Sequence, residues 1–218
     1  MNVKPFARVL RAGAATLGTY AVVLLATRPW HRRWGATDEE IAMELPGDEL
    51  SEGAAANHAI TIDAPIEEVW SWLVQIGQDR AGFYSYSWLE NLVGADIHNS
   101  DSIVPEWQSL EEGSYLRLAS AKLYGDRPLL RISHVDPGRS FVLEGWGAFV
   151  LIPIDSKTTR MIIRTHAVTR KPLLRVLDFF IGEPAHFIME RGMLIGIKTR
   201  AERSARSGLA ATGTNGGI

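Results

Sequence analysis

The chain contains no cysteine, which excludes disulfide-stapled secreted scaffolds and cysteine-ligated zinc or iron–sulfur sites. It also lacks a strong excess of either charge. Its 23 basic and 25 acidic residues argue against a general nucleic-acid-binding protein. Nucleophile-elbow, phosphate-loop and dinucleotide-binding glycine patterns are absent as well. What the chain does have is apolar bulk: seven Trp, seven Phe and five Tyr suffice for a well-packed domain of about 150 residues.

The charges are unevenly distributed along the chain. The first 33 residues hold six basic side chains and no acid, which leaves 17 bases against 25 acids for the rest. Between these cations lies an uncharged run from Ala12 to Thr27. A helix over this run would span roughly 24 Å, against a hydrocarbon core of about 30 Å. Residues 1–34 are therefore predicted to be membrane-directed. Three alternatives stay open: a single-span anchor, an interfacial helix, or a signal-like segment or helix that covers the domain.

Composition also predicts the limits of the folded domain. Residues 35–57 are acidic and contain Pro46-Gly47, which indicates a linker with one short helical turn. Residues 207–218 have little to bury and are predicted to be a disordered tail. The domain itself is expected over 58–206.

The first half of that domain has the pattern of one strand followed by two helices. Residues 59–63 alternate as a strand, and Ala64-Pro65 then begins a helix whose apolar residues recur at helical spacing. Gly77 ends this helix. A second short helix is predicted from Tyr86 to Val93.

The second half changes to a period of two. Short turn-like connections join successive segments, which predicts an antiparallel meander over residues 114–120, 129–135, 140–144, 148–154 and 159–168. In the last strand Met161 and Ile163 belong to the inner face, whereas Arg160 and Arg164 point outward. Residues 172–206 are helical in character, with a break or kink at Glu183-Pro184.

This order predicts an α+β fold in which a curved antiparallel sheet wraps around a long C-terminal helix, with an apolar N-terminal helix added. A cavity is expected between the sheet and the C-terminal helix. Gly192 and Gly196 in that helix are four residues apart, which favours close packing against a neighbouring element.

Two blocks carry a resemblance to a known family. The segment from Ile60 to Gly94, which opens its helix with APIEEVW, and the segment from His186 to Arg203 resemble the START/polyketide cyclase (SRPBCC) superfamily over about two thirds of the chain. The resemblance implies a helix-grip fold, a deep apolar pocket and a domain on the cytoplasmic side. Members bind lipids, sterols, hormones or polyketide intermediates, and some are cyclases, so membership does not decide the chemistry. The N-terminal apolar helix departs from the minimal domain.

Candidate ligand-binding residues come from a loop, from aromatic side chains and from the inner face. Arg80 and Tyr84 lie on one loop, where they would orient a carbonyl or carboxylate of the ligand; alternatively, Arg80 ties the helix to the sheet. The other candidates are Trp88, Trp107, Trp146, Met161, Ile163, Phe187 and Glu190. Trp88 has the alternative of core packing.

Metal and cofactor sites are not expected. The six histidines, at positions 31, 58, 98, 134, 166 and 186, show no zinc-ligand spacing. The carboxylates Glu90 and Glu190, like the others, form no pair at a diagnostic spacing.

The function predicted from these observations is a membrane-associated binding or carrier domain for a hydrophobic small molecule such as a lipid, isoprenoid or polyketide-like compound. The alternative is a cyclase or dehydratase in which a buried Glu or His of the same pocket moves a proton. No nucleic acid is expected as a partner.

Overall fold

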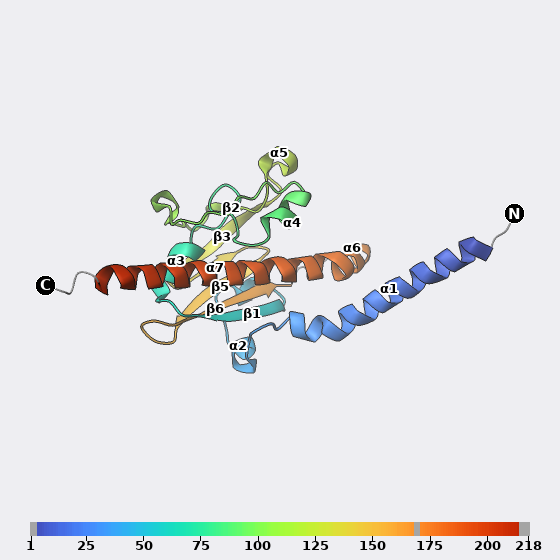
Figure 1. The fold of residues 1–218 in the computed structure, drawn as a ribbon, viewed down its shortest axis with the longest axis horizontal. Coiled ribbons are helices and arrows are strands. Elements are labelled where there is room, and N and C mark those ends of the chain that lie inside the picture. The colour runs from blue at the N-terminus through green and yellow to red at the C-terminus, as the bar shows by residue number, and fades with distance from the viewer. Residues whose placement is uncertain (1–3, 168–170, 214–218) are drawn as a thin grey trace.

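The computed structural model describes residues 4–167 and 171–213. One antiparallel sheet has the strand order β1-β6-β5-β4-β3-β2, and the long helix α7 (Glu183–Gly213) lies along it (Figure 1). The strands are β1 Ala54–Ile62, β2 Tyr115–Arg117, β3 Leu129–Asp136, β4 Ser140–Leu143, β5 Gly147–Pro153 and β6 Thr159–His166. The α+β helix-grip arrangement predicted from the sequence is confirmed.

The two predicted helices lie between β1 and β2. They are α3 (Ile66–Leu73) and α4 (Ser87–Leu92), and a 3-10 turn, η2 (Pro105–Trp107), follows in the long loop. The strand predicted over 114–120 is shorter in the structure, because the Ser120 carbonyl accepts from the Tyr124 amide and starts the short helix α5 (Ala121–Tyr124).

The alternation predicted for β6 is confirmed. Met161 and Ile163 are fully buried in the core that faces α3 and α7. Ile162 points to the other face of the sheet, where it packs with Ala59 and Val150 in a second, smaller cluster. A buried residue on the outer face requires a covering layer, and the acidic segment supplies it.

That acidic segment contains structure of its own. Helix α2 (Asp38–Ala42) begins with a capping box between Thr37 and Glu40, and a 3-10 turn, η1 (Asp48–Leu50), follows. Arg164, only 4% exposed, donates 2.5 Å to the Asp48 carboxylate and 2.7–2.8 Å to the carbonyls of Met43 and Glu40. Residues 37–50 are thus packed against the sheet rather than extended as a linker.

Strand β1 begins at Ala54, five residues before the predicted strand. The added residues form the register Ala54 with His166 and His58 with Ile163, on the edge of β6. Alanine and asparagine are poor strand formers, so propensity alone did not indicate this extension.

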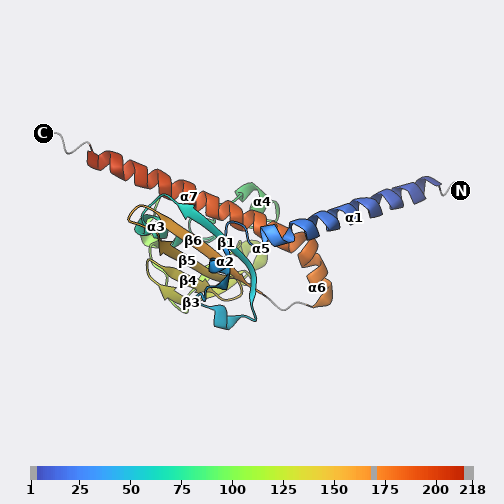
Figure 2. The same cartoon turned by 90° about the horizontal axis from the view of Figure 1, so that it is seen from below.

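Helix α1 (Lys4–His31) extends away from the body of the molecule (Figures 1 and 2). It is longer than the uncharged run from Ala12 to Thr27. Within the described residues, no helix combines the length and the apolar character needed to cross a bilayer, in contrast to the single-span alternative.

The C-terminal region starts with α6 (Pro172–Leu177) and one π-helical turn, η3 (Asp178–Gly182), before α7. The irregular turn ends next to the predicted break at Glu183-Pro184, where proline lacks the amide that a regular helix needs. The prediction of disorder from Ser207 is wrong as far as Gly213, because α7 continues to that residue. Residues 214–218 lie outside the described part.

Close packing at the two helix glycines is confirmed. Gly192 faces Ser85 and Tyr86, and Gly196 faces the backbone of Tyr84. A Cβ atom on Gly196 would lie 2.1 Å from the Tyr84 carbonyl oxygen. This contact holds the loop after α3 against the terminal helix.

We expect Gly196→Ala to lower the free energy of unfolding by about 1–3 kcal/mol, because the backbone at Tyr84 must move to admit the methyl group. The matched control is Gly18→Ala in α1, where nothing lies within 4 Å and alanine is the better helix former. Chemical denaturation measures both. Equal stability of Gly196→Ala and the unchanged chain would contradict the packing argument.

Candidate functional site

A cavity of about 830 Å³ lies at one end of the interface between the sheet and α7. Its walls come from the end of α1, from β1 and β6, from α4 and from the start of α7. The remainder of the interface is solid, because Phe141 and Phe149 stack there at 4.7 Å and Met161 and Ile163 are fully buried. The hollow is therefore local.

Apolar and aromatic side chains form most of the cavity wall. Trp146 is central: its ring lies 6.0 Å from Phe83 and 5.3 Å from Phe149. The large apolar side chains of the lining are Phe83, Leu118, Leu130, Trp146, Phe179, Phe187, Met189 and Met193. Such a wall suits an apolar molecule.

One buried carboxylate organises the polar end of the cavity. Glu190, on α7, is 1% exposed, and each of its two carboxylate oxygens has hydrogen-bonding partners. Its Oε1 lies 2.5 Å from His58 Nδ1. Its Oε2 accepts from the Trp146 indole at 2.9 Å and the Thr165 hydroxyl at 3.2 Å, and lies 2.8 Å from His186 Nε2. Four elements of the fold thus meet at one carboxylate.

The charges in this cluster stabilise each other. Burial alone would raise the pKa of Glu190, but His186 and then His58 outweigh it and hold the pKa below its ordinary value. Burial likewise disfavours a charged His186, yet the adjacent Glu190 raises the pKa of that imidazole overall. The pairing therefore favours the imidazolium form of His186 next to an ionised Glu190, and His186 also lines the cavity.

His58 connects the cluster to α1. Its Nε2 lies 2.7 Å from the His31 carbonyl oxygen, which can only accept, so that nitrogen carries a hydrogen. His31 in turn contacts Glu183 at 3.0 Å through its ring, and Arg28 donates to both oxygens of Glu183 at 2.9 and 3.0 Å. The end of α1 is thereby fixed to the start of α7 beside the cavity.

A second carboxyl group lines the cavity in a different environment. Glu90, on α4, has a buried Oε2 that has no hydrogen-bond partner in the described part of the chain. Burial raises the pKa of Glu90 to about 7. Glu90 and Glu190 therefore differ in protonation near neutral pH although both belong to one cavity.

The structure brings three of the predicted site residues together: Trp146, Phe187 and Glu190 all line the cavity. Met161 and Ile163 lie in the solid part of the core. Trp88 is 66% exposed and borders a separate, smaller hollow together with Phe187. Trp107 packs at the edge of the core.

Arg80 and Tyr84 hold the loop together and do not line the cavity. Arg80 donates to the backbone carbonyls of Trp107 and Ser109 in the long loop before β2, so it ties two loop segments together and not the helix to the sheet. The Tyr84 hydroxyl accepts from Gln75 Nε2 at 2.7 Å, and Arg200 stacks 4.7 Å above the Tyr84 ring. Burial raises the pKa of Tyr84 to about 12.

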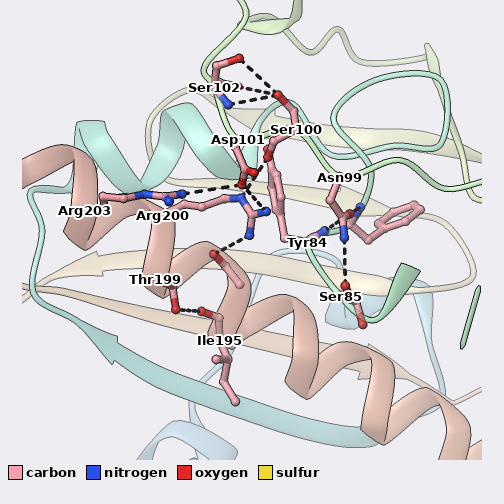
Figure 3. Close-up of polar contacts among 12 residues, drawn as sticks. Tyr84, Ser85, Asn99, Ser100, Asp101, Ser102, Ile195, Thr199, Arg200 and Arg203 are labelled. Atoms are coloured by element: carbon pink, nitrogen blue, oxygen red, sulfur yellow. Dashed lines mark hydrogen bonds and ion pairs between the residues drawn. The ribbon is translucent and has the colours of Figure 1, made fainter. Parts of the chain in front are cut away.

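Figure 3 shows the surroundings of Tyr84. Arg200 also donates 2.8 Å to Asp101, and Asn99 accepts from the Tyr84 amide at 2.7 Å (Figure 3). Arg200 thus fixes this loop on α7, whereas Asn99 holds the backbone of the loop itself.

The sequence did not predict that four polar residues line one cavity together: His58, Glu90, Thr165 and His186. One signal was present, because His186 and Glu190 are four residues apart and so share a helix face. Thr165 also followed the inner-face alternation of Met161 and Ile163. In the described part of the chain, no group of three acidic or imidazole side chains is arranged to hold a metal ion.

Comparison with known proteins gives structural similarity only. No protein-family model matches the chain, and no curated protein sequence matches it. Among solved structures, the self-sacrificing resistance protein CalC from Micromonospora echinospora is similar with a TM-score of 0.43 at 11% identity, over 69% of this chain and 95% of that one.

Two further solved structures are similar. The Polyketide_cyc-like protein Cgl2372 from Corynebacterium glutamicum has a TM-score of 0.29 at 14% identity, over 65% of this chain and 87% of its own. The protein encoded by gene BPP1335 from Bordetella parapertussis has a TM-score of 0.32 at 17% identity, over 75% of this chain and 94% of its own. The fold class itself rests on the strand order and on α7.

Proposed function

We propose that this chain binds a hydrophobic small molecule in the cavity beside Glu190 and carries it at a membrane surface. The observation that supports binding most directly is the cavity itself, about 830 Å³, with Phe, Trp, Leu and Met side chains in its wall. An apolar ligand gains about 25 cal/mol for each Å² of apolar surface removed from water. A lipid, an isoprenoid or a polyketide-like compound has the required apolar area.

The polar end of the cavity selects among such ligands. Glu190 already has hydrogen-bonding groups on both oxygens, whereas His186 presents to the cavity an imidazole whose protonated form Glu190 favours. A ligand with one carbonyl, hydroxyl or carboxylate oxygen would accept from His186 while its apolar part lies against Trp146 and Phe187. The preferred ligand is thus amphipathic, with a single oxygen-bearing end.

We expect the full chain, purified from its host and examined by native mass spectrometry, to retain an apolar molecule or to bind one from a panel of fatty acids, isoprenoids and aromatic polyketides. Leu118→Trp fills the cavity and should weaken binding at least tenfold. Leu123→Trp is the matched control, because Leu123 is an exposed leucine of α5. An apo chain that binds nothing in the panel would refute the proposal.

A second candidate function is catalysis by proton transfer, and Glu90 is the observation that favours it. A desolvated carboxyl group with a pKa near 7 is well matched to a general base at neutral pH. His186, kept charged by Glu190, would stabilise the negative charge that develops on a ligand carbonyl. Removal of a proton next to a carbonyl is the first step of many dehydrations and cyclisations.

If this candidate is correct, the chain should exchange the C1 protons of 2-tetralone for deuterium in D₂O, followed by proton NMR. The rate should rise with pH through about 7, because only ionised Glu90 accepts a proton. Glu90→Gln should lower the rate at least a hundredfold. The exposed Glu67→Gln should leave it unchanged. Exchange at the uncatalysed rate would rule this candidate out.

The electrostatic assignment has its own test, independent of any ligand. In Glu190→Gln the carboxylate that raises the pKa of His186 is lost while the burial remains, so the His186 imidazole should lose its proton at lower pH. NMR titration of the imidazoles measures this shift, with the exposed His98 as an internal reference. If the His186 titration is unchanged in Glu190→Gln, Glu190 does not raise the pKa of His186.

A further inference from the structure

Large apolar side chains of α1, α6 and η3 are exposed. Both α1 and α6 extend from the body at the same end of the molecule (Figure 2). On α1, Leu17 is 65% exposed and Leu25 is 58% exposed. On α6 and η3, Leu173 is 80% exposed and Ile181 is 61% exposed. Exposed apolar side chains gathered at one end of a molecule indicate an interaction site.

The exposed side chains of α1 and of the α6–η3 segment adjoin because α1 contacts η3, which directly follows α6. The Tyr20 hydroxyl donates 2.8 Å to the Phe180 carbonyl, and the two rings lie 6.1 Å apart. Arg28 stacks 5.5 Å above Phe179 and pairs with Glu183. We call the apolar surface of Leu17–Trp30 and Leu173–Ile181 the α1/α6 surface.

The cavity opens within this surface. Its lining includes Arg28 from α1 and Arg175, Asp178 and Phe179 from α6 and η3. Arg175 is exposed, so this part of the lining is the mouth. Whatever covers the α1/α6 surface therefore lies directly over the entrance to the cavity.

Charge decides which partner fits the surface. Besides Arg28, which pairs with Glu183, the sequence of α1 carries Lys4, Arg8 and Arg11 and no acid. A second copy of the chain would bring the same cations against this helix without an acidic partner on it, which disfavours self-association. An anionic lipid surface supplies the opposite charge and an apolar layer together.

The rest of the chain favours one orientation on such a surface. Beyond residue 33 the chain has 17 bases against 25 acids, so an anionic membrane attracts the α1 end and repels the body. The exposed apolar side chains then enter the boundary between headgroups and acyl chains, where α1 does not need to span the bilayer.

We propose that the α1/α6 surface docks peripherally on an anionic lipid bilayer and turns the mouth of the cavity toward the lipid. The role of the mouth rests on the proposed function, since an apolar cargo would pass between bilayer and cavity without crossing water. The docking itself depends only on the α1/α6 surface and its charge.

The test is sedimentation of the full chain with vesicles of phosphatidylcholine, alone or with 30% phosphatidylglycerol, at 0.1 and 0.5 M salt. We expect binding to the anionic vesicles, at least tenfold weaker binding to the neutral ones, and a decrease at high salt. The double variant Leu173→Glu, Val176→Glu should reduce binding to anionic vesicles at least tenfold. Both side chains are exposed, so the fold should persist.

The matched control is Leu123→Glu, Ile154→Glu, which changes two similarly exposed apolar side chains away from α1 and α6. It should bind anionic vesicles as the unchanged chain does. An equal loss in both double variants would overturn the proposal, as would equal binding to neutral and anionic vesicles. If the chain is a dimer in solution and does not bind vesicles, the α1/α6 surface is instead an interface with a second copy, which would also overturn the proposal.

Failure of docking and failure of ligand binding are distinguishable. Native mass spectrometry without vesicles reports cavity occupancy alone. A chain that binds ligand but no vesicles refutes docking and leaves the binding function intact. A chain that binds anionic vesicles but no ligand refutes the binding function and leaves docking intact.

Discussion

The structure around the cavity depends on keeping one buried carboxylate paired. An ionised Glu190 in the interior would cost several kcal/mol without its partners. Three partners come from distant parts of the chain, namely His58 from β1, Trp146 from the turn before β5 and Thr165 from β6, whereas His186 lies one turn earlier on α7 itself. The polar requirement of a single side chain thus fixes how two strands, a turn and the long helix meet.

The same requirement explains how α1 is attached to the domain. His58 uses one ring nitrogen for Glu190 and the other for the His31 carbonyl, so the end of α1 is part of the hydrogen-bond chain. Arg28 and Glu183 add an ion pair between α1 and α7. An N-terminal helix that packs little of its own surface is nevertheless directed by these contacts, which place it at the mouth of the cavity.

Local patterns predicted most of the fold but little of the polar site. The alternation of buried and outward residues in β6 and the four-residue spacing of Gly192 and Gly196 are patterns of residues close together in the sequence. Both could therefore be recognised from the sequence directly. The cluster at Glu190 joins His58 to a residue 132 positions away, and the sheet register decides that contact. Arg164 was likewise expected to face outward, but its carbonyl partners in the acidic segment have no side-chain signature. The sequence therefore predicted that the Arg164 side chain points away from the core. It did not predict that Arg164 binds residues 37–50 against the outer face of the sheet.

The cavity persists because its largest wall residues are held in place. Trp146 donates its indole N–H to Glu190 and packs edge-on against Phe149, so its ring cannot turn into the hollow without leaving a carboxylate short of a donor. Phe187 lies against the rings of Trp30, His31 and His58 at 5.3–5.5 Å. Aromatic side chains that would otherwise collapse inward are thus tied to the polar cluster. The buried charge that determines the chain's packing at this end thus also helps to keep the cavity open.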